Sequence, residues 1–89
     1  YYVYVFSKTC SHCGKIKNQI IPYSLENSNF FYLEFCDSIK IISDTSVILG
    51  TYNPFDIGIS GTPTLLVIED HFLALNICGT ENISNYLEF

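Results

Sequence analysis

The order of apolar and polar stretches predicts a strand and then a helix at the start of the chain. Residues 1–6 form an unbroken run of β-branched and aromatic side chains, which is typical of a strand covered on both faces. After the polar residues 7–9, one helical face collects Cys13, Ile16, Ile20 and Ile21. Pro22 should kink or stop this helix, because proline lacks a backbone N–H and clashes with the carbonyl one turn earlier.

A second strand is predicted over residues 30–36, where aromatic and aliphatic side chains again dominate. A strand, helix and strand in succession imply two parallel strands joined by a right-handed crossover. Residues 37–58 match neither the helical nor the strand period well. We interpret them as a connection with one short helix near residues 44–50.

The second half of the chain predicts a hairpin and a closing helix. Residues 64–68 and 72–78 are strand-like and are separated by a short polar turn. Thr80 after Gly79 is typical of a helix N-cap, and Ile83, Tyr86 and Leu87 supply an apolar stripe. The whole order is βαβ, linker, ββα. It predicts an α/β fold with a central four-stranded mixed sheet flanked by helices.

Composition and charge narrow the class of protein. With 89 residues, of which 48% are apolar and 16% aromatic, the chain can fill one core, so residues 1–89 form one domain. Nine carboxylates against four lysines give a net charge of −5, which disfavours nucleic acid and anionic lipid as partners. The longest apolar runs are far below the roughly 20 residues that a membrane span needs.

Two cysteines at the predicted helix start carry the candidate chemistry. Cys10 and Cys13 are three positions apart, which allows them to close a small disulfide ring. The helix dipole, Lys8 and His12 should lower the pKa of the Cys10 thiol and so favour the reactive thiolate. Cys13, one turn inward, would then resolve a mixed disulfide. The pattern predicts thiol–disulfide exchange.

The chain resembles the thioredoxin superfamily in two motifs. Residues 5–13 read Val-Phe-Ser-Lys-Thr-Cys-Ser-His-Cys, and residues 61–67 read Gly-Thr-Pro-Thr-Leu-Leu-Val. The resemblance covers the chain except for residues 37–58, and it implies a minimal thioredoxin-like fold. It also implies a cis bond between Thr62 and Pro63, a place for both residues beside the disulfide, and pairing of the Thr62 backbone with an extended substrate.

The departures from the family indicate an oxidising or isomerising role. Cytosolic reductants of the family carry Trp before the first cysteine, Gly-Pro between the two and a buried Asp beneath the second, where this chain has Thr9, Ser11–His12 and Tyr4. A histidine before the second cysteine resembles disulfide isomerases and bacterial extracytoplasmic oxidases. A partly protonated His12 stabilises the reduced thiolate, which makes the disulfide a stronger oxidant. Ser11 and Lys8 join His12 as tuning residues.

The resemblance also implies partners and a compartment. Substrates would be thiols and disulfides of proteins or peptides, and a second protein would recycle the active pair. No metal or organic cofactor is needed, and the domain would act as a monomer. Compared with a full thioredoxin, the chain lacks the first strand and helix. Because it opens at Tyr1 directly in a strand-like run and has no Met, we expect it to begin inside a longer gene product, after a removed signal peptide or membrane anchor. An extracytoplasmic bacterial location, secreted or membrane-anchored, is favoured.

Two alternatives remain open at this point. The fold could serve as a peptide-binding or accessory module with a vestigial cysteine pair. A zinc-stabilised domain would need further ligands, for which the candidates are Cys36, Cys78, His12 and His71.

The remaining cysteines and the second histidine have simpler interpretations. Cys36 and Cys78 should end different strands on opposite flanks of the sheet, so a disulfide between them is not expected. We interpret both as buried thiols that act as small hydrophobes, with an auxiliary redox role for Cys78 as the alternative. His71 should lie on the surface of the hairpin turn.

Overall fold

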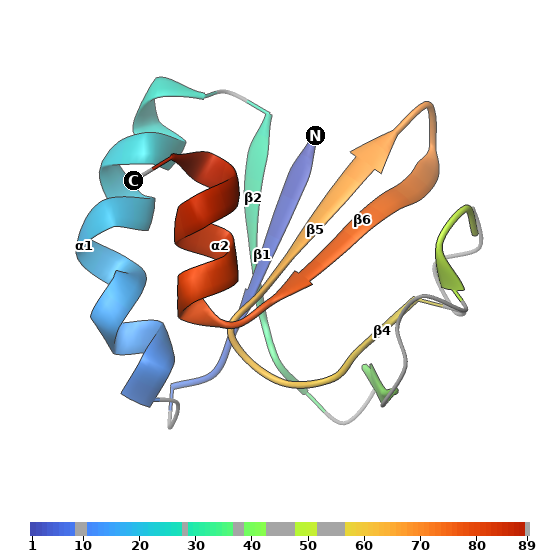
Figure 1. Cartoon of the computed structure of the whole chain (residues 1–89), viewed down its shortest axis with the longest axis horizontal. Coiled ribbons are helices and arrows are strands. Elements are labelled where there is room, and N and C mark those ends of the chain that lie inside the picture. The colour runs from blue at the N-terminus through green and yellow to red at the C-terminus, as the bar shows by residue number, and fades with distance from the viewer. Residues whose placement is uncertain (9–10, 28, 37–38, 43–47, 52–56, 89) are drawn as a thin grey trace.

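The chain forms an α/β structure around one mixed sheet of four strands (Figure 1). The computed structural model describes residues 1–8, 11–27, 29–36, 39–42, 48–51 and 57–88, and in helix and strand it describes only the backbone of residues 11–13, 15 and 40. The strands lie in the order β2-β1-β5-β6. Their bounds are Tyr2–Phe6 for β1, Phe30–Glu34 for β2, Thr64–Glu69 for β5 and Phe72–Cys78 for β6.

The strand directions agree with the predicted βαβ and hairpin units. β1 runs parallel to β2 and antiparallel to β5, and β5 and β6 form the expected antiparallel hairpin. β1 is therefore an interior strand of the sheet. A parallel pair needs a crossover connection, and helix α1, Ser11–Glu26, supplies it.

Both helices cover one face of the sheet. Helix α2 spans Thr80–Leu87 and lies beside α1 (Figure 1). The core on this face is made of buried side chains from both helices and from three strands: Tyr4, Ile16, Ile20, Phe30, Leu65 and Ile83. Burying each such side chain contributes about 1.5–3 kcal/mol, so this contact fixes where the helices lie.

The opposite face is covered by the segment between β2 and β5. A second core cluster gathers there, formed by Val5, Ile59, Leu66, Ile68 and Leu73. Within this covering segment two short parallel strands pair, β3 at Lys40–Ile41 and β4 at Gly58–Ile59. The sequence pattern did not predict this small second sheet, because each of its strands has two residues. The helix expected near 44–50 falls mainly on residues outside the described part of the chain.

Pro22 was expected to kink or stop the first helix. Helix α1 does not stop there and continues to Glu26. Only one backbone donor is lost at a proline, and the turn beyond it is held by Tyr23, whose ring contacts Phe30 edge-on at 5.8 Å. Ile21, expected on the apolar face, is 40% exposed, whereas Ile16 and Ile20 are buried.

The start of α2 also differs from the expectation. Gly79, not Thr80, is the N-cap, and no side chain caps the helix there. Gly79 has φ 96° and ψ 147°, a conformation that residues with a Cβ rarely adopt. Thr80 is instead the first residue of the helix.

Candidate functional site

One edge of the sheet brings together the ends of several strands. Val5, near the end of β1, pairs with Thr64 at the start of β5, and Thr64 pairs in turn with Cys78 at the end of β6. The chain beyond β2 joins them, because the Phe35 amide donates to the Phe6 carbonyl at 2.7 Å. Both helices begin at this edge (Figure 1).

The backbone of the cysteine motif begins helix α1 at this edge. Ser11, His12 and Cys13 form the first turn, as the sequence pattern predicted. Cys10 precedes the helix directly in the sequence and lies outside the described residues, as do the side chains of Ser11, His12 and Cys13. The motif is thus placed by its helix, which follows the interior strand β1.

The N-terminus of α1 carries no acidic residue in its first turn, whereas α2 has Glu81 there. The positive end of the α1 dipole is therefore not offset by a carboxylate of its own turn. An anion held at such a helix start is stabilised by about 0.3–1 kcal/mol. A thiolate is an anion of this kind.

Lys8 lies in the connection between β1 and α1, but it is not a lone charge. Its Nζ atom is 3.9 Å from Oε2 of Glu34 at the end of β2, and both side chains are largely exposed. Ion pairs this exposed contribute little to stability. The Glu34 carboxylate offsets part of the positive charge that the sequence analysis assigned to thiolate tuning.

The Thr62–Pro63 segment lies at the same edge, immediately before β5. Its peptide bond is cis, as expected. The Pro63 carbonyl accepts a hydrogen bond from the Gly79 amide at 2.9 Å. The Gly61 carbonyl accepts from Thr64 Oγ1 at 2.5 Å and from Cys78 Sγ at 3.9 Å. Pro63 is buried and Thr62 half-buried, so the segment is fixed on both sides.

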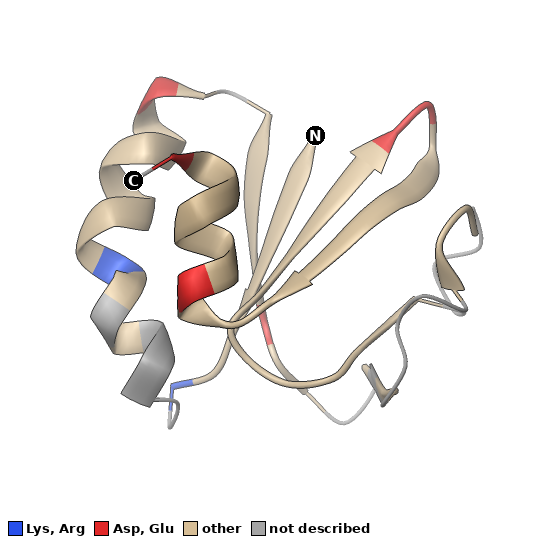
Figure 2. Cartoon of the chain, viewed as in Figure 1, with Lys and Arg blue, Asp and Glu red and all other residues tan. Residues whose placement is uncertain are grey.

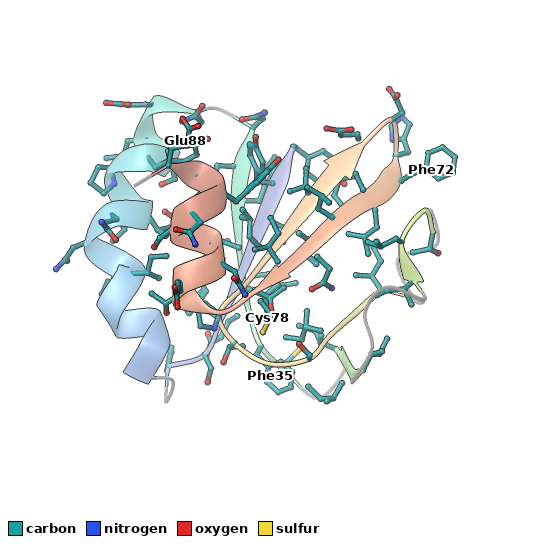
Figure 3. All side chains as sticks on the ribbon, viewed as in Figure 1. Phe35, Phe72, Cys78 and Glu88 are labelled. Carbon is teal, nitrogen blue, oxygen red and sulfur yellow. The ribbon has the colours of Figure 1, made fainter. Side chains whose placement is uncertain are left out.

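Cys36 and Cys78 lie on opposite flanks of the sheet, as expected. Cys36 follows the outer strand β2, Cys78 ends the outer strand β6, and no disulfide joins them. The interpretation as buried thiols is wrong for Cys36, which is exposed, and Cys78 is only half-buried. Cys78 and Phe35 both lie toward the edge that holds the site, and Phe72 lies at the far end of β6 (Figure 3). His71 is exposed in the hairpin turn, as predicted.

Tyr4, a residue of β1, lies in the core beneath α1. The side chain is 4% exposed and packs in the core beneath α1 with Ile16 and Ile20. Its hydroxyl oxygen is buried as well. This position therefore presents an aromatic ring and a phenol, not a carboxylate, to the helix that carries the motif.

In the described part of the chain, no three side chains of the types His, Cys, Asp and Glu gather as a metal site. None of its helices is long and apolar enough to cross a membrane. Comparisons with protein-family models, with curated proteins and with solved structures found no match.

Two features of the site were not predicted from the sequence. The first is the hydrogen bond from the Gly79 amide to the Pro63 carbonyl, which lies just beyond the paired residues of β5 and β6. The second is the uneven charge: Lys8, Lys15 and Lys17 are three of the four lysines, and no acidic residue precedes Glu26. This asymmetry could have been read from the sequence. Lys8 precedes α1 and Lys17 lies within it, and Figure 2 shows blue segments before and within α1 but a red segment in the first turn of α2.

Proposed function

We propose that the chain is a thioredoxin-like domain that exchanges disulfides with protein or peptide substrates through Cys10 and Cys13. The observation that carries the proposal is the meeting of two motifs at one sheet edge. The first turn of α1, with His12 and Cys13, follows β1, and the Thr62–Pro63 segment enters β5 where it pairs with β1. The βαβ and ββα units around one mixed sheet also support a thioredoxin-like arrangement.

The reaction would proceed in two exchanges. The Cys10 thiolate attacks one sulfur of a substrate disulfide, forms a mixed disulfide and releases the other sulfur as a thiolate, which takes up a proton. The Cys13 thiolate then attacks the Cys10 sulfur and releases the second substrate thiol. Two electrons pass to the substrate, and a Cys10–Cys13 disulfide remains. The same steps in reverse oxidise a pair of substrate thiols.

The direction we propose is oxidation or isomerisation. A thiolate at the start of α1 gains from the helix dipole, which no acidic residue of the first turn offsets. A partly protonated His12 would add to this effect. Stabilising the reduced thiolate makes the disulfide more oxidising. Such an activity fits an extracytoplasmic compartment, with a second protein restoring the disulfide.

The test is the reduction potential of the Cys10–Cys13 couple. We would equilibrate the protein in glutathione buffers, alkylate the remaining thiols and read the mass. The Cys36→Ser, Cys78→Ser double variant is the suitable background, because Cys36 is exposed and would add its own alkylation. We expect a potential between about −120 and −180 mV, the range of oxidases and isomerases.

Three other outcomes are informative. A potential of about −270 mV would mean that the protein exchanges disulfides but acts as a reductant. In the same background, Cys10 should alkylate faster than Cys13 at mildly acidic pH, and Cys10→Ser should remove the fast phase. If the pair forms no disulfide in any buffer, the exchange function is wrong and a peptide-binding module takes its place.

A further inference from the structure

A groove opens between helix α1 and the strands β1 and β2. Its volume is about 630 Å³. The floor comes from β1 and one wall from α1, and Tyr32 of β2 forms the other side. Among the described residues, its lining includes Phe6, Lys8, Gly14, Lys17, Ile21 and Leu25. We call it the α1–β2 groove.

The interior of the α1–β2 groove is apolar and pre-formed. The rings of Tyr4 and Phe6 stack at 6.4 Å with an angle of 12° between their planes. Ser24 on α1 and Tyr32 on β2 are hydrogen-bonded through their hydroxyls, which ties the two walls together. An apolar surface with a few polar groups at its margin is typical of a binding site.

The groove begins beside the cysteine motif. Gly14, which lines it, follows Cys13 directly, and Lys8 lies two positions before Cys10. A Cβ atom added at Gly14 would meet no heavy atom within 4 Å, so the wall is open at this point. A polypeptide whose cysteine reacts at the motif could therefore lay its neighbouring residues along the groove.

The charges of the groove oppose those of the protein as a whole. The net charge is −5, yet the charged side chains in the described lining of the groove are Lys8 and Lys17. Glu34 lies beside Lys8 at 3.9 Å, whereas Lys17 is exposed on α1. The first turn of α1, next to the groove, adds no carboxylate. A carboxylate of a partner would meet positive charge here and repulsion over most other surfaces.

We propose that the α1–β2 groove binds the substrate segment next to the reacting cysteine and selects apolar segments that carry Asp or Glu. This inference rests on the proposed exchange function, and it names the class of substrate that the function would serve. The apolar side chains of the segment would lie on Phe6, Ile21 and Leu25, which are half-buried or exposed, whereas Tyr4 and Ile20 are buried beneath them. Its carboxylates would face Lys17 and, in part, Lys8.

The experiment uses short peptides that each carry a single cysteine as a mixed disulfide with glutathione. All contain the same pair of leucines, and they differ only in carrying two aspartates, two lysines or two serines. The reduced protein, in the Cys36→Ser, Cys78→Ser background, would release peptide thiol and glutathione and form the Cys10–Cys13 disulfide. We expect the aspartate peptide to react about threefold or more faster than the lysine peptide, since exposed charge pairs are worth tenths of a kcal/mol to about one.

A matched pair of variants distinguishes the effect of charge at the groove from the effect of the net charge of the protein. Lys17→Gln and Gln19→Glu change the net charge equally and lie on the same helix, but Gln19 is exposed and does not line the groove. Lys17→Gln should lower the aspartate-to-lysine rate ratio about twofold, and Gln19→Glu should change it much less. Raising the salt from about 0.05 M to about 0.5 M should bring the ratio toward one, because the charges are exposed.

The apolar part of the proposal has its own variant. Gly14→Leu fills the open point of the wall. It should slow the leucine peptides relative to one additional peptide, in which serines also replace the two leucines. Equal rates for all peptides, or equal effects of Lys17→Gln and Gln19→Glu, would overturn the groove proposal while leaving the exchange function intact. If the wild type also fails to react with oxidised glutathione, the exchange function itself is wrong and the inference falls with it.

Discussion

The backbone amide of Gly79 donates a hydrogen bond of 2.9 Å to the carbonyl oxygen of Pro63, and so joins the start of α2 to the segment before β5. The bond forms because Gly79 has φ 96°, which turns the chain from the end of β6 directly into the helix. This single residue thus ends a strand, caps a helix and holds a segment of the candidate site.

Gly79→Ala should lower the free energy of unfolding by about 1–3 kcal/mol, because a side chain is strained at this φ and ψ. The space around the added Cβ is not the cause, since its nearest neighbour would be Nδ2 of Asn82 at 4.0 Å. Urea denaturation followed by circular dichroism measures the change. A stability equal to the wild type would contradict the strained conformation.

Gly14→Ala should have the opposite sign and raises the free energy of unfolding by about 0.5–1 kcal/mol. Gly14 lies in α1, is exposed and has open space where a Cβ would stand. Alanine is preferred to glycine in a helix by about this amount. The same urea titration tests it, and a loss of stability would show that the wall of the groove is more crowded than described.

The hairpin turn between β5 and β6 places two residues in left-handed conformations, Asp70 at φ 51° and His71 at φ 68°. Asn-Gly is the preferred pair in a two-residue turn of this kind. Asp70→Asn combined with His71→Gly should therefore raise the melting temperature, by an amount equivalent to about 0.5–1 kcal/mol. As a control, Asn85→Gly in helix α2 should lower the melting temperature, by an amount equivalent to a few tenths of a kcal/mol.

Alkaline pH should destabilise the fold through Tyr23 and Tyr86. Burial, followed by the neighbouring Tyr2, raises the pKa of both phenols above the ordinary value of 10.0. The folded state holds these protons more tightly than the unfolded chain, so the stabilisation is complete below pH 10 and is lost as pH rises above it. Guanidinium denaturation between about pH 8 and pH 11 should show the decline.

A double variant gives the control for this effect. The double variant Tyr23→Phe, Tyr86→Phe removes the two phenols whose pKa is raised. The variant should show a smaller decline of stability at alkaline pH. An unchanged slope would mean that other groups cause the loss. The chain has seven tyrosines, so the absorbance of tyrosinate reports on Tyr23 and Tyr86 only as the difference between titrations of the wild type and of the double variant.

The strands and the hairpin could be predicted from the sequence because their signals are local. The aromatic and β-branched run at residues 1–6 and the turn at Asp70 and His71 each specify their own conformation. The path of α1 through Pro22 could not be predicted in this way. It depends on the contact of Tyr23 with Phe30, which lies on a different element.

The candidate site was predictable in its motif but not in its surroundings. The sequence shows directly the spacing of Cys10 and Cys13 and the Thr62–Pro63 pair. The bond from Gly79 to Pro63 and the groove beside Gly14 depend on how strands and helix pack. Cys36 was misread for a related reason, since a cysteine after an apolar strand gives no sign of whether a later segment covers it.

The pairing of Val5 with Thr64 and of Thr64 with Cys78 means that the site is built from strands that lie far apart in the sequence. No short fragment contains it, and a nascent chain acquires it only after β6 has been synthesised. Contacts between such distant parts of a chain form late and slowly. Any activity at this edge would therefore report on completion of the whole domain and disappear in the same cooperative transition as the sheet.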